Sequence, residues 1–284
     1  MSEKLPFNKA YVEITNVCNL DCSFCKGTDR KKEFMSADRF YAAAKKLTKV
    51  TKYIYLHVLG EPTLHPELEK ILEICKDLDL KVIITTNGTL VNKVSDILLQ
   101  SKALHKVNIS LHAFEANSGI DFVQYLEGCF EFARKINEHG KICVLRLWNE
   151  DRENIYHENT LNDVIIQSLK EHFTGGEWTQ NTKGYRIKEK LFLELAERFN
   201  WRQEASEGKI NCYGLRDQIG VLVDGTVVPC CIDCDGAISL GNIFDGEIEE
   251  IINSPLARQI AQGFRNGKAV HPYCKGCGFV RTRL

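Results

Sequence analysis

Three cysteines lie close together near the start of the sequence, at Cys18, Cys22 and Cys25, in the pattern C-x3-C-x2-C. Thiolates select soft or borderline metals such as zinc or the iron of iron–sulfur clusters. A [4Fe–4S] cluster is ordinarily held by four cysteines, so a set of three leaves one iron open for a small ligand. The alternative that the spacing leaves open is a zinc site completed by a fourth residue elsewhere in the chain.

A second group of four cysteines lies in the last part of the sequence. Cys212 is followed after 17 residues by Cys230, and Cys274 and Cys277 form a C-x2-C pair. Four cysteines in a small module with two short strands suit a fully ligated iron–sulfur cluster and a zinc ribbon equally well. The spacing therefore predicts a metal centre in this region without choosing between the two.

The remaining cysteines fall outside these two groups. We interpret Cys75, Cys129 and Cys143, which are scattered singly through apolar segments, as small buried hydrophobes without a chemical role. Cys231 and Cys234 stand beside the second group. We expect them to be buried thiols next to the metal centre, with replacement of a lost ligand as the alternative.

The composition excludes several classes of protein. Lys+Arg 37 against Asp+Glu 38 gives a formal net charge of -1, so there is no overall electrostatic reason to bind nucleic acid or an anionic membrane. Arg30, Lys31 and Lys32 are interpreted as a solvated loop face. No apolar run reaches the roughly 18 residues that a transmembrane helix needs. The N-terminal sequence lacks the basic-then-apolar pattern of a secretory signal, so we expect a cytoplasmic protein with reduced cysteines.

The first half of the sequence alternates between predicted strands and helices. Strands are expected at 11–17, 53–59, 81–86, 106–112 and 141–148, and helices from Ser36, at 66–78, near 90–101 and near 119–138. This alternation predicts an α/β fold with a parallel sheet, in which the chemistry gathers at the carboxyl ends of the strands. The first cysteine group lies in the loop after the first strand.

The second half of the sequence is less regular. We predict a loop at 149–160, a helix at 161–173, a second loop at 175–184 and a helix at 187–199. From about residue 210 come two short strands joined at Asp224-Gly225, which is a hairpin signal, and then a helix interrupted at Pro255. These features predict a small cysteine-rich second domain.

With these elements in place, the sequence resembles the radical S-adenosylmethionine (SAM) superfamily, whose C-x3-C-x2-C loop follows the first strand of a partial α/β barrel. Phe24 stands where that family places an aromatic residue near the adenine. Leu59-Gly60-Glu61-Pro62 resembles the Gly-Gly-Glu-Pro element that receives the methionine amino group, with a leucine in place of the first glycine. The resemblance implies that Gly60 and Glu61 contact SAM and that Cys18, Cys22 and Cys25 bind the cluster.

Other positions at the predicted strand ends resemble the polar contacts of the family. Asn87, at the end of the third strand, and Ser110, in the fourth, match residues that contact the ribose and carboxylate of SAM. Strand alternation puts Asn108, Ser110 and His112 on one face, and Arg146 lies near the end of the fifth strand. His112 and Arg146 are candidate catalytic residues, and Arg146 is also a candidate for SAM binding. The alternative for both is a structural role, as a satisfied interior histidine and as the partner of a structural acid.

The cysteine-rich end of the chain resembles the SPASM or shortened twitch module of radical SAM enzymes. The matching text is GVLVDGTVVPCC, then SLGNIFDG, then CKGC. The resemblance implies an auxiliary [4Fe–4S] cluster held by Cys212, Cys230, Cys274 and Cys277. We expect one auxiliary cluster, because the chain stops seven residues past Cys277. The implied fold is α/β: a partial (β/α)6 radical SAM barrel over residues 1–205, followed by a small cysteine-rich α+β SPASM/twitch domain over residues 206–284.

The resemblance implies S-adenosyl-L-methionine and two [4Fe–4S] clusters as cofactors, one cluster binding SAM and the other auxiliary. Reductive cleavage of SAM yields a 5′-deoxyadenosyl radical that abstracts hydrogen from a substrate. We expect an oxidoreductase that performs a two-electron, dehydrogenase-like oxidation, in which the auxiliary cluster accepts an electron from the substrate radical. The implied partners are a small-molecule or peptide substrate and an electron donor such as flavodoxin or ferredoxin.

Three other functions remain open from the sequence. The protein is alternatively a maturase that modifies a ribosomally synthesised peptide or protein, or a radical SAM enzyme that modifies RNA. The balanced charge speaks against RNA as the substrate. A zinc-binding interaction protein on an α/β scaffold is the alternative that is not an enzyme.

Overall fold

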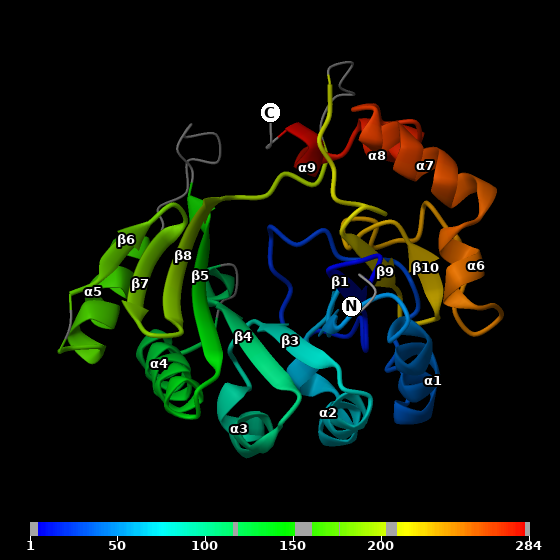
Figure 1. Ribbon diagram of the computed structural model, residues 1–284. Helices are drawn as coiled ribbons and strands as arrows, with labels where there is room; N and C mark the ends of the chain where they lie inside the picture. The colour runs from blue at the N-terminus through cyan, green and yellow to red at the C-terminus, as the bar shows by residue number, and fades with distance from the viewer. Residues whose placement is uncertain (1–4, 116–118, 151–160, 176, 203–208, 282–284) are drawn as a thin grey trace. The chain divides into compact units, whose positions relative to one another are not determined.

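The computed structural model describes residues 5–115, 119–150, 161–175, 177–202 and 209–281 (Figure 1). The chain forms two compact units. The first contains Met1–Cys18, Lys26–Val82 and Asn200–Leu284, and the second contains Asn19–Cys25 and Ile83–Phe199. The C-x3-C-x2-C loop is therefore shared, with Cys18 in the first unit and Cys22 and Cys25 in the second.

The strands of the first unit are joined in the order β11-β10-β9-β1-β2. Their bounds are Lys9–Val12 for β1, Tyr53–Tyr55 for β2, Gln218–Val221 for β9, Thr226–Val228 for β10 and Gly241–Asn242 for β11. β1 pairs in parallel with both β2 and β9, and β10 is antiparallel to β9 and β11. The hairpin predicted at Asp224-Gly225 is confirmed, since it joins β9 to β10.

Two of the longer helices of the first unit begin at a capping serine. The helices of this unit are α1 Ala37–Leu47, α2 Leu68–Asp77, α6 Ile248–Ile252, α7 Pro255–Arg265, α8 Pro272–Lys275, α9 Gly278–Arg281 and the 3-10 helix Pro62–Leu64. Ser36 and Ser254 cap α1 and α7, each accepting a 3.3 Å hydrogen bond from a backbone amide of the first turn. The predicted helix start at Ser36 and the interruption at Pro255 are both confirmed.

The second unit combines parallel strands with helices on one side of them. Its elements are most of β3 Lys81–Thr86, then α3 Val91–Gln100, β4 Leu104–Ser110, α4 Phe122–Glu138, β5 Ile142–Glu150, α5 Asn162–His172, β6 Thr179–Asn181, β7 Gly184–Lys188 and β8 Leu191–Glu197. The strand order is β3-β4-β5-β8-β7-β6, and β4, β5 and β8 pair in parallel. Figure 1 shows α3 and α4 beside the strands β3 to β5.

The helix predicted at 187–199 is wrong. This segment forms the end of β7 and the whole of β8, which pairs in parallel with β5. Leu191 and Leu193 are completely buried, whereas Phe192 and Glu194 between and after them are partly exposed. That period of two is typical of a strand, and pairing with β5 outweighs the helix propensity of the Leu, Glu and Ala residues.

The loop predicted at 175–184 is wrong in its second half. Thr179–Asn181 forms β6 and pairs antiparallel with β7, which begins at Gly184. All three β6 residues are exposed, so no apolar period marks this strand in the sequence. The loop predicted at 149–160 falls mostly outside the described residues.

The strand predicted at 106–112 ends two residues early. β4 stops at Ser110, and residues Leu111–Phe114 form a 3-10 helix. His112 therefore does not follow the alternation of β4.

The prediction that Cys75, Cys129 and Cys143 are buried is confirmed, because none of them has exposed surface. In the described part of the chain, no helix is both long and apolar enough to cross a membrane.

Candidate cluster and cofactor sites

The first cysteine group lies in the loop between β1 and α1. Cys18 and Cys25 are exposed and Cys22 is partly exposed. A turn inside the loop is closed by the amide of Cys25, which donates to the carbonyl of Cys22 at 2.9 Å. Three accessible thiols in one short loop are the donor set that an open-site [4Fe–4S] cluster requires.

Gly60 packs directly against the backbone that leads into this loop. Its φ is +75°, and a Cβ placed on it would lie 2.4 Å from the carbonyl oxygen of Thr15 and 2.9 Å from that of Val17. No other residue fits such an approach without moving backbone. The amide of Glu61 donates to the Val17 carbonyl at 2.8 Å. The element Leu59-Gly60-Glu61-Pro62 is thus joined to the residues immediately before Cys18.

The Glu61 side chain is buried, with 1% of its surface exposed. Its Oε1 accepts hydrogen bonds from the amide of Thr63 at 3.0 Å and from the Thr63 hydroxyl at 2.6 Å. These bonds cap the 3-10 helix Pro62–Leu64 and fix the carboxylate in one orientation. An oriented carboxylate can accept hydrogen bonds from an ammonium group.

Asn87 connects the end of β3 to the cysteine loop within the second unit. Its side-chain amide donates to the Oδ1 of Asn19 at 3.0 Å, and Asn19 in turn donates to the Thr89 hydroxyl at 2.8 Å. The Oδ1 of Asn87 accepts from the amide and the hydroxyl of Thr89. Asn19 lies one residue after Cys18, so Asn87 helps to fix the loop that carries the cysteines.

Phe24 and His112 pack on one another within the second unit. Their ring centroids are 5.0 Å apart, and the Arg198 guanidinium lies 5.9 Å from the Phe24 ring. Burial lowers the pKa of His112 to about 4, so the imidazole is neutral near pH 7. The backbone amide of Trp148 lies 3.3 Å from His112 Nδ1, a contact in which Nδ1 accepts. The structure thus brings together two of the predicted site residues.

Ser110 and Arg146 are register partners on the parallel strands β4 and β5, so they share one face of the sheet. Arg146 Nε lies 3.5 Å from Glu194 Oε2 on β8, and its guanidinium lies 4.2 Å from the centroid of the Trp148 ring. The structure therefore gives Arg146 an acidic partner. Its role in SAM binding or catalysis stays a prediction.

Sequence reasoning missed a buried ion pair between Glu13 and Arg30. Glu13 has no exposed surface, and its two carboxylate oxygens each lie 2.8 Å from Nη2 of Arg30. The carboxylate also accepts from the amides of Leu59 and Val223. Burial raises the pKa of Glu13, and Arg30 opposes that rise. The interpretation of Arg30 as part of a solvated face is wrong; no local pattern indicates a partner 17 residues away.

The four cysteines of the second group line one small cavity in the first unit. The other residues around it include Asp233, Phe264 and Tyr273, and the cysteines are Cys212, Cys230, Cys274 and Cys277. Among the described residues, no three His, Cys, Asp or Glu side chains are close enough to hold a single metal ion. Four thiols around one cavity are the donor set of a fully ligated [4Fe–4S] cluster, so the residues present fit that group.

Burial keeps three of these thiols protonated in the absence of a metal. It raises the pKa of Cys212 and Cys230, and it raises the pKa of Cys274 to about 12. Metal ligation requires thiolates, so loading the cavity releases protons. The amide of Gly214 donates to the sulfur of Cys212 at 3.4 Å, an interaction that favours the thiolate.

Cys231 and Cys234 do not line this cavity. The Cys231 thiol is hydrogen-bonded to the side chain of Tyr11, and the Cys234 sulfur lies 3.8 Å from Nζ of Lys26. Lys26 also forms an ion pair with Asp235. Both thiols therefore contact the loop and strand residues around them, beside the cavity and outside it.

Residues 12–158, more than half of the chain, match the radical SAM superfamily. The chain belongs to the radical SAM superfamily. Residues 212–278 of this radical SAM protein match the SPASM domain, an iron–sulfur cluster-binding domain. The two matches indicate SAM and two [4Fe–4S] clusters as its cofactors.

Several curated relatives share part of the sequence of this radical SAM protein. It is 33% identical over 129 residues to a probable GTP 3′,8-cyclase of Sulfurisphaera tokodaii, covering 42% of this chain and 41% of that protein. It is 36% identical over 118 residues to a probable GTP 3′,8-cyclase of Methanococcus maripaludis, covering 40% and 37%. The chain thus spans about two fifths of the length of the curated relatives that it matches.

Solved structures share the fold over most of the chain. BtrN in complex with AdoMet and 2-DOIA superposes with a TM-score of 0.56 at 17% identity, covering 93% of this chain and 89% of that one. Streptococcus suis SuiB superposes with a TM-score of 0.63 at 18% sequence identity, covering 96% of this chain and 71% of SuiB. The structure of anSMEcpe with AdoMet and a peptide superposes with a TM-score of 0.62 at 16% identity, covering 96% of this chain and 87% of that one. The expected α/β architecture, a partial radical SAM barrel followed by a cysteine-rich region, is confirmed.

Proposed function

We propose that this radical SAM enzyme is an oxidoreductase that removes two electrons and two hydrogens from a small molecule or a peptide. The barrel would occupy residues 1–205 and the auxiliary cluster domain residues 206–284. The observation that carries the proposal is the cavity lined by four cysteines in the second group. A cluster with four cysteine ligands has no open iron for a substrate, so electron transfer is the role that suits it.

The first cysteine group would supply the radical. Cys18, Cys22 and Cys25 would hold the open-site cluster, and Glu61 would accept hydrogen bonds from the methionine ammonium of SAM. When bound, this cluster supplies the electron that cleaves SAM to methionine and a 5′-deoxyadenosyl radical. Gly60 would allow the peptide backbone to approach the methionine group. Asn87 would contact the ribose while fixing the cysteine loop through Asn19.

The substrate side of the site would be formed by residues of β4, β5 and the cysteine loop. Phe24 would cover the adenine, with the neutral His112 packed against its ring. Ser110 would contact the SAM carboxylate. Arg146, paired with Glu194, would present a cation whose position is fixed by β8. With Nδ1 accepting from the Trp148 amide, the neutral His112 imidazole carries its proton on Nε2, and this nitrogen would donate a hydrogen bond to an oxygen of the substrate.

Both substrate classes fit what the compared proteins bind. BtrN was solved with 2-DOIA, a small molecule, and SuiB and anSMEcpe were solved with peptides. The proposed oxidation is the same on either class: one hydrogen atom leaves to the 5′-deoxyadenosyl radical, and one proton and one electron follow. A flavodoxin or ferredoxin would serve as the reductant for SAM cleavage, and a cytoplasmic location stays a prediction.

The test uses the anaerobically reconstituted protein with dithionite, SAM and extracts of the native organism. We expect 5′-deoxyadenosine and a species lighter by two hydrogens in the mass spectrum. GTP is tested in parallel because the curated relatives are named as cyclases. Conversion of GTP to an isomer of equal mass, or a substrate that gains mass, would overturn the oxidation. Zinc in place of iron and sulfide would overturn the enzyme assignment itself.

A further inference from the structure

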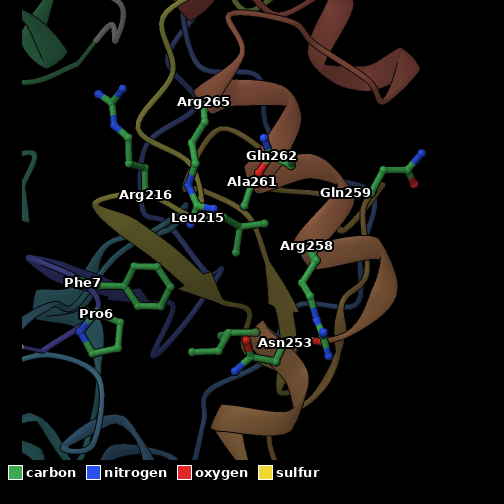
Figure 2. A pocket seen from close by; sticks show the side chains of 11 residues that line it. Pro6, Phe7, Leu215, Arg216, Asn253, Arg258, Gln259, Ala261, Gln262 and Arg265 are labelled. Carbon is green, nitrogen blue, oxygen red and sulfur yellow. The ribbon is translucent and has the colours of Figure 1, made fainter.

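A groove of about 690 Å³ lies within the first unit, away from the cysteine cavity that the proposed function uses (Figure 2). Its walls are the N-terminal segment at Phe7, the turn at Leu215-Arg216 and one side of α7. No part of the proposed SAM chemistry employs these residues.

Cationic side chains stand along the groove. Arg216, Arg258 and Arg265 line it, and none of the described residues that line it is acidic. The charge of Arg216 is partly neutralised, since its Nη2 lies 3.8 Å from Oδ2 of Asp217. Arg258 Nε donates to the carbonyl of Asn253 at 2.5 Å, which orients the guanidinium without neutralising its charge. The groove therefore favours an anionic occupant.

The spacing of two arginines indicates an occupant larger than a single small anion. Arg258 and Arg265 are seven residues apart on α7, which places them on one side of the helix about 10 Å apart along its axis. In the orientations of Figure 2 the two guanidinium groups do not converge on one small anion. Figure 2 shows Arg258 extending toward Asn253 and Arg265 toward Leu215. Carboxylates distributed over a protein surface match this separation.

The floor between the arginines is apolar. Phe7 and Leu215 are 6% and 7% exposed, so each presents a small apolar area at the bottom of the groove. Leu215 has a φ of +53°, an unusual conformation for a leucine, and its amide is held by the carbonyl of Gln218 at 2.9 Å. A strained residue at this position is maintained by the surrounding turn. An apolar centre, a polar rim and an enrichment in arginine are typical of protein interfaces.

The same turn connects the groove to the four-cysteine cavity. Leu215 follows Gly214, whose amide donates to the sulfur of Cys212. A Cβ on Gly214 would lie 3.3 Å from the Phe264 ring and 3.5 Å from the Cys212 sulfur. Phe264 lines the cysteine cavity, whereas Ala261 and Arg265 on the same helix line the groove. Leu215, which lines the groove, is thus only three residues after Cys212, which lines the cavity.

We propose that the groove docks an acidic one-electron carrier protein of the flavin or iron–sulfur class, with its carboxylates paired to Arg258 and Arg265. This proposal rests on the proposed function. In each turnover the substrate gives one hydrogen atom to the 5′-deoxyadenosyl radical and one proton to a base. The remaining electron would reduce the carrier by one electron, and Cys212, Cys230, Cys274 and Cys277 would hold the centre that supplies it.

The test measures binding of an acidic [2Fe–2S] ferredoxin to the reconstituted protein by calorimetry at low and high salt. The variants are Arg258→Glu, Arg265→Glu and their combination, and the conservative variants are Arg258→Lys and Arg265→Lys. Lys170→Glu is the matched control, because Lys170 is likewise an exposed basic residue in the last turn of a helix, α5. We expect the double glutamate variant to weaken binding at least tenfold, with little change in the lysine variants and in Lys170→Glu.

Wild-type affinity in the double glutamate variant would overturn the docking proposal. So would a polyglutamate peptide that binds the groove while the ferredoxin does not, since the occupant would then be an acidic peptide. Dithionite-driven SAM cleavage and substrate oxidation are measured on the same samples. SAM cleavage by dithionite needs no carrier, so its failure in the wild type would reject the proposed function and leave the binding result interpretable on its own.

Discussion

The amide of Glu61 donates a 2.8 Å hydrogen bond to the carbonyl of Val17, the residue before Cys18. The element expected to receive the methionine group of SAM and the element expected to hold the cluster therefore share a backbone contact. Gly60 makes this contact possible, since any Cβ there would meet the carbonyl of Thr15. The backbone of Glu61 is thus held by main-chain atoms, a contact that does not depend on the side chain at position 59.

Gly60→Ala should destabilise the protein more than Gly140→Ala. Both glycines have a positive φ, +75° and +72°, but only Gly60 has backbone within reach of an added Cβ. The shared conformational cost is about 1 kcal/mol, and the clash at Gly60 should add about 1–3 kcal/mol. Urea denaturation measures both losses, and iron content should fall only in Gly60→Ala. Equal losses in the two variants would contradict the packing argument.

The triple variant Cys18→Ala, Cys22→Ala and Cys25→Ala should lose one [4Fe–4S] cluster and all SAM cleavage. Open-site chemistry requires these thiolates together, while the auxiliary site is built from other residues. Iron analysis should report about half of the wild-type content, and chromatography should detect no 5′-deoxyadenosine. Continued production of 5′-deoxyadenosine would contradict the role of this loop.

Glu61→Gln should weaken SAM binding by at least tenfold. A charge-assisted hydrogen bond to the ammonium contributes about 1.5–3 kcal/mol. Thr63→Val is the matched control, because it removes the hydroxyl that donates to Glu61 but keeps the carboxylate. Equilibrium binding of SAM to the reconstituted protein distinguishes the two. A SAM dissociation constant unchanged in Glu61→Gln would indicate a different mode of binding.

Arg30→Met should destabilise the protein, and the loss should grow as the pH rises. Burial raises the pKa of Glu13 above 4.5 in the folded state, so ionisation of Glu13 lowers stability as the pH rises through that folded pKa. Without Arg30 the folded pKa is higher still. The loss should approach about 3–5 kcal/mol above the folded pKa, because a buried carboxylate is then unpaired.

Denaturation curves at pH 5 and pH 8 check this expectation. Glu13→Gln combined with Arg30→Met should recover stability at pH 8, since no buried charge remains. Lys31→Met is the control, because the Lys31 side chain is 86% exposed and its pair with Glu33 lies at the surface. The same loss at both pH values in Arg30→Met would show that Glu13 does not titrate as described.

Replacing the four cysteines of the second group by alanine should remove one cluster while SAM cleavage persists. The substituted residues are Cys212, Cys230, Cys274 and Cys277. Cys231→Ala and Cys234→Ala are the controls, because these residues lie beside the cavity and do not line it. Each control should keep both clusters. Loss of iron from either control would show that its cysteine is itself a cluster ligand. The quadruple variant should keep an unchanged circular-dichroism spectrum, which excludes unfolding as the cause of its iron loss.

The spacing of chemical groups along the chain could be predicted well, because a cysteine motif and its loop are local in sequence. The capping serine at Ser36 and the break at Pro255 are local signals too, and both are confirmed. The convergence of the four distant cysteines on one cavity could be expected only from the family resemblance. No local pattern in the sequence indicates that Cys212 and Cys277 lie close together in the fold.

Other features depend on partners that are distant in sequence. Leu191 and Leu193 lie among good helix formers, and only pairing with β5 makes the segment a strand. Arg30 stands in a run of cations that looks solvated until Glu13 is placed beside it. His112 follows a strand that ends two residues earlier than its apolar pattern suggests.

The pairing of β9 with β1 bears on how the protein is made. The four residues of β1 pair with four of β9, so the cysteine-rich part completes the sheet that the N-terminal part begins. During synthesis β1 leaves the ribosome long before β9 exists, and its unpaired edge must be protected from aggregation until then. A shortened chain that lacks β9 keeps that edge permanently open. We therefore expect the segment that carries β9 to contribute to folding as well as to supply cysteines.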